Sequence, residues 1–347
     1  MSTKTKVFGN LLVDVIKKER CVGCGACAAS CPVKSITFEN GIPKLVGLCI
    51  SCGICYNSCP RSMFDETVVE SKIFGRNRIE KEAELGIVKS QYAVKTTQED
   101  VGRSCQDGGA VTSTLIKFVS ESERCAVVAA IDENMIWQPK PFVAKNRAEL
   151  VKAAGSKYTS CPILVGVDSA ISEYKLKEIA VVGMPCQIRA LRRIETEEVA
   201  NSRLSDAVNL KIGLFCMETF DYEDLIKFLE SEGVEVSKIT KFAITRGQFI
   251  AYQGEKKVFE VKLSKLKKLV RACCEECKDF TSEFADISVG NVGSPDGWST
   301  VLVRTEQGES ALMTARDAGL IEVKRLEEVG GVIEEVLKLA KLKKNKN

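Results

Sequence analysis

The sequence predicts an α/β protein in two parts, a small cysteine-rich N-terminal module and a larger α/β domain with a largely parallel sheet. Two observations support this architecture. A cysteine motif occurs twice within residues 21–60. From residue 91 onward, apolar β-branched runs of strand length alternate with helical patterns, which is typical of strands joined by crossover helices. With 347 residues, the chain is long enough for two or three domains.

The repeated motif begins at Cys21 (CVGCGACAASCP) and again at Cys49 (CISCGICYNSCP). Each copy reads Cys-x-x-Cys-x-x-Cys-x-x-x-Cys-Pro. Three closely spaced thiolates hold one side of a [4Fe–4S] cluster, and the fourth, which precedes proline, serves the other cluster. The alternative is a zinc ribbon, which uses two Cys-x-x-Cys pairs rather than a double run of four. We therefore assign one cluster to Cys21, Cys24, Cys27 and Cys59, and the other to Cys49, Cys52, Cys55 and Cys31.

The domain boundaries follow from these patterns. We expect a two-cluster ferredoxin domain over residues 1–66 and the larger domain over residues 91–347. Residues 67–90 are charged and weakly periodic, so they form either a linker or a surface helix. The stretch from Leu326 to the end predicts an amphipathic helix with a basic tail, most simply a solvated helix end. Within the larger domain we expect strands at 125–131, 178–184, 208–216 and 285–292, and helices at 110–121, 186–195 and 222–231.

The composition excludes several classes of function. The balance of 50 Lys and Arg against 47 Asp and Glu gives a net charge of only +3, too weak to indicate nucleic acid binding. No apolar stretch approaches the length of a transmembrane segment. No secretion signal accompanies the 16 cysteines, so metal ligation in a reducing cytoplasm is expected rather than disulfides. Histidine is absent, which removes His-based catalysis, imidazole zinc sites and His-ligated haem.

The larger domain contains candidates for a third cluster. Cys186 follows a predicted strand and Cys216 ends another, and the strand ends of a parallel sheet gather at one edge, where sites form. Together with the pair Cys274-x-x-Cys277 they make a candidate site of four thiolates, although Cys273 competes with its neighbours as a ligand. A redox-active dithiol formed by Cys274 and Cys277 is the alternative.

Six stretches of the larger domain together resemble the flavin-containing beta subunit of the hydrogenases that reduce coenzyme F-420, a deazaflavin hydride carrier of archaea. That hydrogenase subunit lacks a two-cluster module in front. A chain that joins both parts is more similar to the electron-input subunit of the reduced-F-420 dehydrogenases, which feed a membrane complex related to respiratory complex I. The stretches are CQDGGAVTSTL (105–115), AAGSKYTSCP (153–162), VVGMPCQIRAL (181–191), KIGLFCMETF (211–220), CCEECKDF (273–280) and ADISVGNVGSPDGWSTVLVRT (285–305).

The resemblance implies bound FAD, hydride exchange between F-420 and the flavin, and one [4Fe–4S] cluster in the larger domain, making three in all. Such chemistry is consistent with the cysteine motifs, because a flavin exchanges electrons both with a hydride carrier and with one-electron clusters. Carried over residue by residue, the ligands of the third cluster fall on Cys186, Cys216, Cys274 and Cys277.

The expected cofactor contacts lie in three stretches. The sequence has no G-x-G-x-x-G fingerprint, so we expect no Rossmann dinucleotide site. Backbone N–H groups of QDGG, at the start of the predicted helix 110–121, are candidates for the flavin phosphates. Lys157 is the candidate catalytic residue, facing an anionic cofactor, or else a solvated lysine. The glycine-rich loop from residue 290 lets backbone approach the flavin, or else forms tight turns. The expected cofactor-binding residues are Gln106, Asp107, Gly108, Gly109, Thr112, Ser156, Lys157, Tyr158, Gly290, Asn291, Gly293, Ser294, Asp296 and Trp298.

The function implied by the resemblance is oxidation of reduced F-420, with electrons passed to a membrane-bound complex-I-like core or to soluble ferredoxin. The expected location is the cytoplasm or, through a partner complex, the inner face of the membrane. The alternatives are a soluble F-420:ferredoxin oxidoreductase and an electron-relay subunit without its own substrate. Arg189, Arg192 and Arg193 are expected either to border the cleft for the anionic F-420 tail or to form a solvated helix face.

Overall fold

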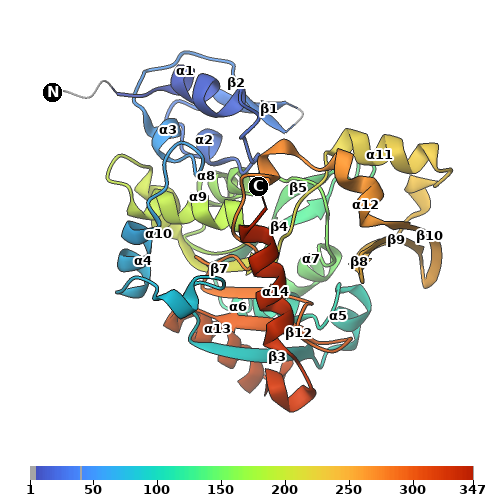
Figure 1. Cartoon of the computed structure of the whole chain (residues 1–347). Coiled ribbons are helices and arrows are strands. Elements are labelled where there is room, and N and C mark those ends of the chain that lie inside the picture. The colour runs from blue at the N-terminus through green and yellow to red at the C-terminus, as the bar shows by residue number, and fades with distance from the viewer. Residues whose placement is uncertain (1–4, 40, 347) are drawn as a thin grey trace.

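The N-terminal module of the computed structural model, which describes residues 5–39 and 41–346, consists of short elements (Figure 1). These elements pack around cysteine side chains. Phe8, Leu11, Val15, Ile36 and Tyr56 form its apolar core together with several of these cysteines. Such a small apolar core is typical of a module that depends on metal for much of its stability. Its elements are α1 (Phe8–Leu11), α2 (Ala26–Ala29), β1 (Ile36–Glu39), β2 (Ile42–Leu45) and α3 (Ile54–Asn57), with β1 and β2 antiparallel.

A mixed sheet forms the centre of the larger domain. Its strands are β3 (Ser90–Thr96), β4 (Arg124–Ile131), β5 (Pro139–Ala144), β6 (Glu178–Gly183), β7 (Val208–Leu214), β11 (Ile287–Gly290), β12 (Ser299–Val303) and β13 (Ile321–Arg325). Within residues 41–346 these eight strands have the order β13-β3-β12-β11-β7-β6-β4-β5. The central strands β11, β7, β6 and β4 are parallel, whereas β5 and β12 run antiparallel to their neighbours. The expectation of a largely parallel sheet is therefore right for the centre and wrong toward the edges.

The central strands are apolar on both faces. In β4, Cys125 and Val127 join one apolar cluster, whereas Ala126 and Val128 join another on the opposite face. Alternate residues of a strand point to opposite faces, so a strand covered on both sides reads as a continuous apolar run. This explains why the strands expected at 125–131, 178–184, 208–216 and 285–292 all occur, as β4, β6, β7 and β11.

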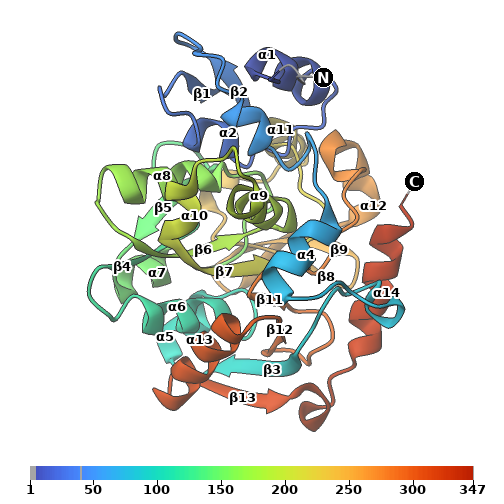
Figure 2. The same ribbon diagram turned by 90° about the vertical axis from the view of Figure 1, so that its left-hand side faces the viewer.

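Helices cover both faces of this sheet, and Figure 2 shows the N-terminal module above one group of them. The cluster on one face includes residues of the N-terminal module and of α8 (Ile163–Ser172), α9 (Pro185–Thr196) and α10 (Ser202–Ala207). The cluster on the other face includes residues of α5 (Glu99–Ser104), α6 (Ala110–Phe118), α7 (Arg147–Lys152) and α13 (Glu306–Asp317). The helices expected at 110–121 and 186–195 are confirmed as α6 and α9.

A lobe with its own apolar core follows β7 in the chain. Phe220, Leu229, Phe242 and Phe249 are buried within it. Of its elements, the sequence predicted only the helix at 222–231. The lobe contains α11 (Tyr222–Ser231), α12 (Leu263–Leu266) and an antiparallel sheet of β8 (Lys241–Thr245), β9 (Gln248–Gln253) and β10 (Lys256–Lys262).

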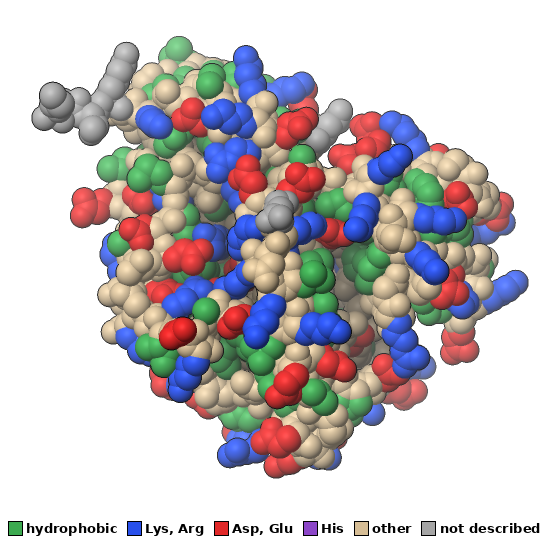
Figure 3. All heavy atoms as spheres, in the orientation of Figure 1, with side chains coloured by type: hydrophobic (Ala, Val, Ile, Leu, Met, Phe, Trp, Pro, Cys, Tyr) green, Lys and Arg blue, Asp and Glu red, His purple; other side chains and the backbone are tan. Residues whose placement is uncertain are grey.

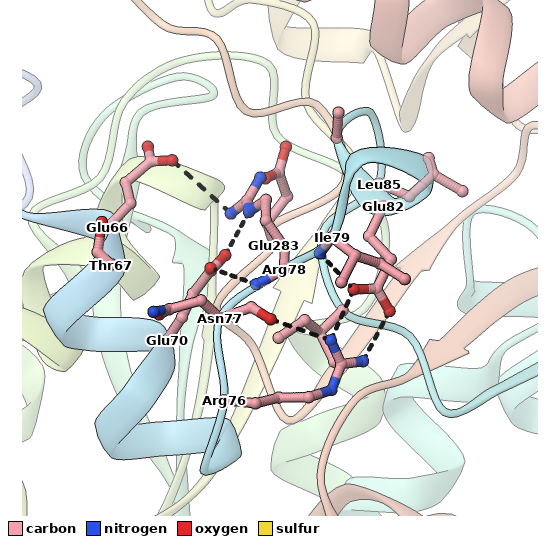
Figure 4. A network of polar contacts seen from close by, with 12 residues as sticks. Glu66, Thr67, Glu70, Arg76, Asn77, Arg78, Ile79, Glu82, Leu85 and Glu283 are labelled. Atoms are coloured by element: carbon pink, nitrogen blue, oxygen red, sulfur yellow. Dashed lines mark hydrogen bonds and ion pairs between the residues drawn. The ribbon is translucent and has the colours of Figure 1, made fainter.

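The segment between the two parts is structured. Helix α4 (Glu66–Phe74) begins at Asp65, whose carboxylate accepts hydrogen bonds from the N–H groups of Thr67 and Val68, and the helix packs against α9. Past its end, Arg78 forms ion pairs with Glu70 of α4 and with Glu283 (Figure 4). Both carboxylate side chains are only 3% exposed. Of the two alternatives for residues 67–90, the helix is therefore present, and ion pairs attach it to the larger domain.

We expect Arg78→Met to destabilise the protein by about 3–5 kcal/mol, because Glu70 would be left buried without a cation and Glu283 with only Lys344. The neighbouring Arg76 is a matched control, since it pairs with Glu82 at 2.7 Å but is 47% exposed. Arg76→Met should cost no more than about 1 kcal/mol. Anaerobic urea unfolding of both variants would measure the difference, and equal midpoints would contradict it.

A C-terminal helix, α14 (Ile333–Lys344), crosses the outside of the larger domain (Figure 1). Val336 and Ala340 are fully buried, and they pack with Leu85 and Phe280. The expected amphipathic helix is confirmed. The solvated end expected for it is wrong in part, because Lys343 near its C-terminus is only 1% exposed.

Candidate redox site

The cysteines of the N-terminal module line two separate cavities. Each cavity has four cysteines on its wall, three from one motif copy and the fourth from the other copy. This is the crossed arrangement expected from the sequence, and the structure brings together the same two sets. The first set is Cys21, Cys24, Cys27 and Cys59, and the second set is Cys31, Cys49, Cys52 and Cys55.

Two glycines shape the loops that carry these cysteines. Gly25 precedes α2 with φ +90°, and Gly53 precedes α3 with φ +79°, both in the left-handed region that favours glycine. At Gly25 a Cβ atom would also lie 2.9 Å from the carbonyl oxygen of Pro162 in the larger domain. Glycine at this position therefore allows the loop both to turn around the cavity and to pack closely against α8.

The four cysteines expected for a third cluster also converge. Cys186 lies in the first turn of α9 after β6, Cys216 follows β7, and Cys274 and Cys277 lie in one loop. Burial raises the pKa of the Cys186 thiol to about 12, and the nearby sulfurs of Cys277 and Cys274 raise it further. Burial likewise raises the pKa of Cys216, with contributions from the sulfurs of the other three. These four cysteines, carried by three separate segments of the chain, therefore form a third set.

Buried thiols of this kind remain protonated unless cations compensate them, and iron supplies that charge on ligation. Among the residues that the structure describes, no three Cys, Asp or Glu side chains are close enough to share one metal ion. In a [4Fe–4S] cluster each thiolate binds a different iron, so its ligands stand further apart than those of a single zinc ion. The donor type and number thus fit iron–sulfur clusters.

The structure also separates the neighbours Cys273 and Cys274. Cys273 is buried in the apolar cluster of the adjacent sheet face. The Cys273 thiol donates a hydrogen bond to the sulfur of Cys274, which lowers the pKa of Cys274 to about 5. The hydroxyl of Thr219 lies 3.6 Å from the same sulfur. Cys274, whose sulfur acts on both Cys186 and Cys216, is therefore the better placed of the two, and it stays the ligand that the resemblance implies.

The three sets are adjacent in the order second, first, third. Cys55 of the second set is close enough to contribute, after burial, to the raised pKa of Cys27 in the first. Cys186 of the third set contributes in the same way to the raised pKa of Cys24. Arg271 lies in the segment that carries Cys274 of the third set. It donates hydrogen bonds of 3.1 Å to the carbonyl oxygens of Cys21 and Val22, and so connects the third set to the first. Clusters bound here would form a continuous electron path.

The three stretches expected to bind the cofactor also meet. The N–H of Ser156 donates to Oε1 of Gln106 at 3.3 Å. The side chain of Asn291 hydrogen-bonds the carboxylate of Asp107. Burial raises the pKa of Asp107, with the nearby charge of Asp296 adding to the effect. Residues 105–109, 156–158 and 290–298 therefore surround one region, at the edge of the sheet where β3 and β11 end.

A helix N-terminus is directed into this region. Gly109 precedes α6 with φ +73°, no side chain caps the helix, and no acidic residue lies in its first turn. Gly108, Gly109 and Thr112 are nevertheless buried. Because a buried helix start with uncapped N–H groups requires a partner, this end of α6 suits an anion such as a phosphate.

Comparison with known proteins agrees with this geometry. Residues 91–167 and 176–329 match the N-terminal and C-terminal models described as coenzyme F-420 hydrogenase/dehydrogenase, beta subunit. The beta subunit of the coenzyme F-420 hydrogenase of Methanothermobacter thermautotrophicus is 35% identical, over 76% of this chain and 95% of its own length. The chain belongs to the family of F-420 hydrogenase/dehydrogenase beta subunits. Residues 13–60 match the model of a 4Fe–4S dicluster domain, so a dicluster domain precedes the family domain.

Two further relatives define the extent of the match. A subunit of the reduced-F-420 dehydrogenase of Methanosarcina mazei is 32% identical over 97% of this chain and 92% of its own length. A chain of the F-420-reducing [NiFe] hydrogenase complex of Methanosarcina barkeri has a similar fold, with a TM-score of 0.70 and 33% identity. That match covers 76% of this chain and 91% of the hydrogenase chain. These relatives are subunits of F-420-dependent oxidoreductases, which supports an oxidoreductase role for this member of the family.

Three glycines expected at the family's cofactor site also pack closely against the protein. A Cβ atom at Gly108 would lie 2.3 Å from the carbonyl oxygen of Val94, and one at Gly290 would lie 2.1 Å from the Phe215 ring. At Gly293 it would lie 2.8 Å from Val336 of α14. Close packing by itself requires glycine at these three positions, and their role at a cofactor stays a prediction.

Lys157 does not have the position of a catalytic residue. Its ammonium group donates to the carbonyl oxygens of Ala153, Ala154 and Gly155, at the end of α7. All three of its N–H bonds are thereby used, and burial lowers its pKa to about 8. The expectation that Lys157 faces an anionic cofactor, or lies free in solvent, is not supported.

The other expected contacts are arranged as follows. The hydroxyl of Tyr158 accepts a hydrogen bond from the N–H of Ile244 in β8, so this ring is attached to the lobe. Ser294 hydrogen-bonds the hydroxyl of Thr300 at 2.7 Å. The ring of Trp298 lies under the ammonium group of Lys324, which is 5.4 Å from its centroid. None of these interactions identifies a cofactor contact by itself.

The three arginines of α9 are structural. Arg192 pairs with the buried Asp286 at 2.7 Å, and Arg193 donates to the carbonyl oxygen of Asn57 in the N-terminal module. Arg189 pairs with Glu66 of α4 and lies over the ring of Phe64. Both expectations for these residues, the cleft and the solvated face, are wrong. Their long side chains attach the N-terminal module and α4 to the sheet.

Sequence reasoning missed Lys241 of β8. Its ammonium group donates to the carbonyl oxygens of Cys105 and Gln106, each at 3.2 Å. The lobe thereby contributes a positive charge to the loop that precedes α6. Arg246 and Gly247 form the two-residue turn of a β-hairpin that begins near Lys241, and both have positive φ (48° and 74°). The glycine in this turn was the one signal in the sequence that could have indicated the hairpin.

Proposed function

We propose that this chain oxidises reduced coenzyme F-420 with bound FAD and passes the electrons singly through three [4Fe–4S] clusters. The observation that carries the proposal is the adjacency of three four-cysteine sets, the last of which lies beside the expected flavin region. Phe215, which precedes Cys216, packs directly against Gly290 of the flavin loop. The path from flavin to the third cluster is therefore short.

FAD would supply the exchange between hydride and single electrons, which neither F-420 nor an iron–sulfur cluster performs alone. The protein contributes binding and alignment. The uncapped start of α6 is the site for the flavin phosphates, and Lys241 places a positive charge beside the same loop. Lys and Arg side chains are spread over α14 and over the lobe on the face shown in Figure 3, which suits the anionic tail of F-420.

The acceptor is proposed to be a membrane-bound complex-I-like core, reached from the second cysteine set, which is the furthest from the flavin region. The protein would then act in the cytoplasm at the inner face of the membrane. No helix in the described part of the chain is long and apolar enough to cross a membrane, so attachment would depend on a partner. The match to a subunit of the dehydrogenase of Methanosarcina mazei, which extends over nearly the whole chain, supports a partner complex as the acceptor.

Quantitation of iron, sulfide and flavin after anaerobic purification tests the proposal. We expect about twelve irons per chain, four for each cysteine set, together with one FAD. A preparation that saturates near eight irons per chain would contradict the presence of a third cluster. A preparation that carries all the iron but no flavin, even after incubation with FAD, would instead indicate an electron-relay subunit without its own substrate.

A further inference from the structure

Helix α14 connects the flavin region to the third cysteine set. At its beginning, the N–H of Val332 donates to the carbonyl oxygen of Gly293 at 2.7 Å, and Val336 packs against Gly293. Along its length it shares an apolar cluster with Val292, Phe215 and Met217, among others. One helix therefore contacts both the loop expected at the flavin and the loop that carries Cys216.

The end of α14 places a buried lysine at this second loop. The ammonium group of Lys343 donates to the carbonyl oxygen of Met217, the residue after Cys216. Lys343 is only 1% exposed, whereas the side chain of Lys341 on the same helix is 60% exposed. Lys346 forms an ion pair of 2.6 Å with Glu218 in the same loop. Two contacts thus hold the end of the helix against residues 216–218.

The charge of Lys343 acts on the cysteine ligands. Its buried ammonium group lies on the carbonyl oxygen of Met217 and so places a positive charge beside the peptide that carries Cys216. A nearby cation stabilises negative charge on sulfur in a region shielded from water. A cluster held by the same sulfurs gains one negative charge when it is reduced.

We propose that Lys343 is a positioning charge that raises the reduction potential of the third cluster, so that this cluster accepts electrons from the flavin. The inference rests on the proposed function. Each hydride brings two electrons and one proton. FAD, when bound, would release these electrons one at a time, the cluster held by the third cysteine set would relay each of them to a cluster held by the first set, and the proton would leave to water.

Redox titration of the full-length protein, followed by EPR spectroscopy, tests the proposal. Lys343→Met should lower the equilibrium constant for one-electron reduction of the third cluster by about tenfold, or ~59 mV. Lys341→Met is the matched control, because it removes the same charge from the exposed side of the same helix. It should leave the potential of the third cluster unchanged, and neither variant should shift the first two clusters as strongly.

Lys343→Arg keeps the charge and should keep most of the wild-type potential. If Lys343→Met assembles the third cluster at an unchanged potential, the proposal is overturned. If the Lys343→Met variant does not assemble the third cluster, the Lys343→Arg variant distinguishes a role of the charge from a role in the fold. A cluster at near wild-type potential in Lys343→Arg supports the role of charge, and loss of the cluster there as well shows that Lys343 only supports the fold. Absence of a third cluster from the wild-type protein would instead contradict the proposed function.

Discussion

Cys277→Ala should lower the iron content from about twelve to about eight per chain and leave the two N-terminal clusters intact. Removal of one of four thiolates breaks the third site, whereas the ligands of the other two sites all lie before residue 61 and line their own cavities. Flavin reduction by reduced F-420 should survive, because the predicted flavin region does not include Cys277. Electron transfer to an external acceptor should fall by at least about hundredfold, since the path is interrupted after the flavin.

The measurements are iron quantitation, EPR spectroscopy and stopped-flow absorbance on the same anaerobic preparation. Cys125→Ala is the matched control, because Cys125 is fully buried in β4 and belongs to none of the three sets. It should retain all of the iron. If Cys277→Ala abolished the signals of all three clusters, the N-terminal module and the larger domain would not be separable in the way proposed.

Reduced F-420 should bleach the flavin at least about hundredfold faster than NADH or NADPH. A nicotinamide dinucleotide requires a pocket for its adenosine half, and the usual site is the turn between a strand and the following helix. In this protein the corresponding turn after β6 is Met184-Pro185-Cys186, so a cysteine of the third set occupies the first turn of α9. This strand-to-helix turn lacks the glycine fingerprint and would hold a cluster ligand where a dinucleotide site needs room for pyrophosphate.

Anaerobic stopped-flow mixing of the FAD-loaded protein with each donor checks this prediction. The rate should be compared at equal donor concentrations, and the free flavin should serve as the control for non-enzymatic reduction. Fast bleaching by NADPH with none by reduced F-420 would contradict the substrate proposal. It would leave the family membership unaffected, since that rests on sequence matches along the chain.

The local parts of this protein are readable from its sequence. The two cysteine motifs predicted both N-terminal sets, including the exchange of Cys31 and Cys59, because ligand spacing on a tight loop is a property of a few consecutive residues. The central strands were predictable for a similar reason. A strand buried on both faces reads as a continuous apolar run, and β4, β6, β7 and β11 all have this pattern.

Other features depend on contacts between residues far apart in the chain. The sequence by itself determined the cluster motifs, the family and the strand ends that carry Cys186 and Cys216. Only the tertiary structure brought the sulfur of Cys274 near those of Cys186 and Cys216, bound the ammonium group of Lys157 to the carbonyl oxygens at the end of α7, and buried Lys343 beside Cys216. The physical reason is that a lysine at the end of an amphipathic helix has the same local pattern whether it faces water or a neighbouring loop. Burial and charge pairing, which decide between the two, arise only when α14 packs across the domain.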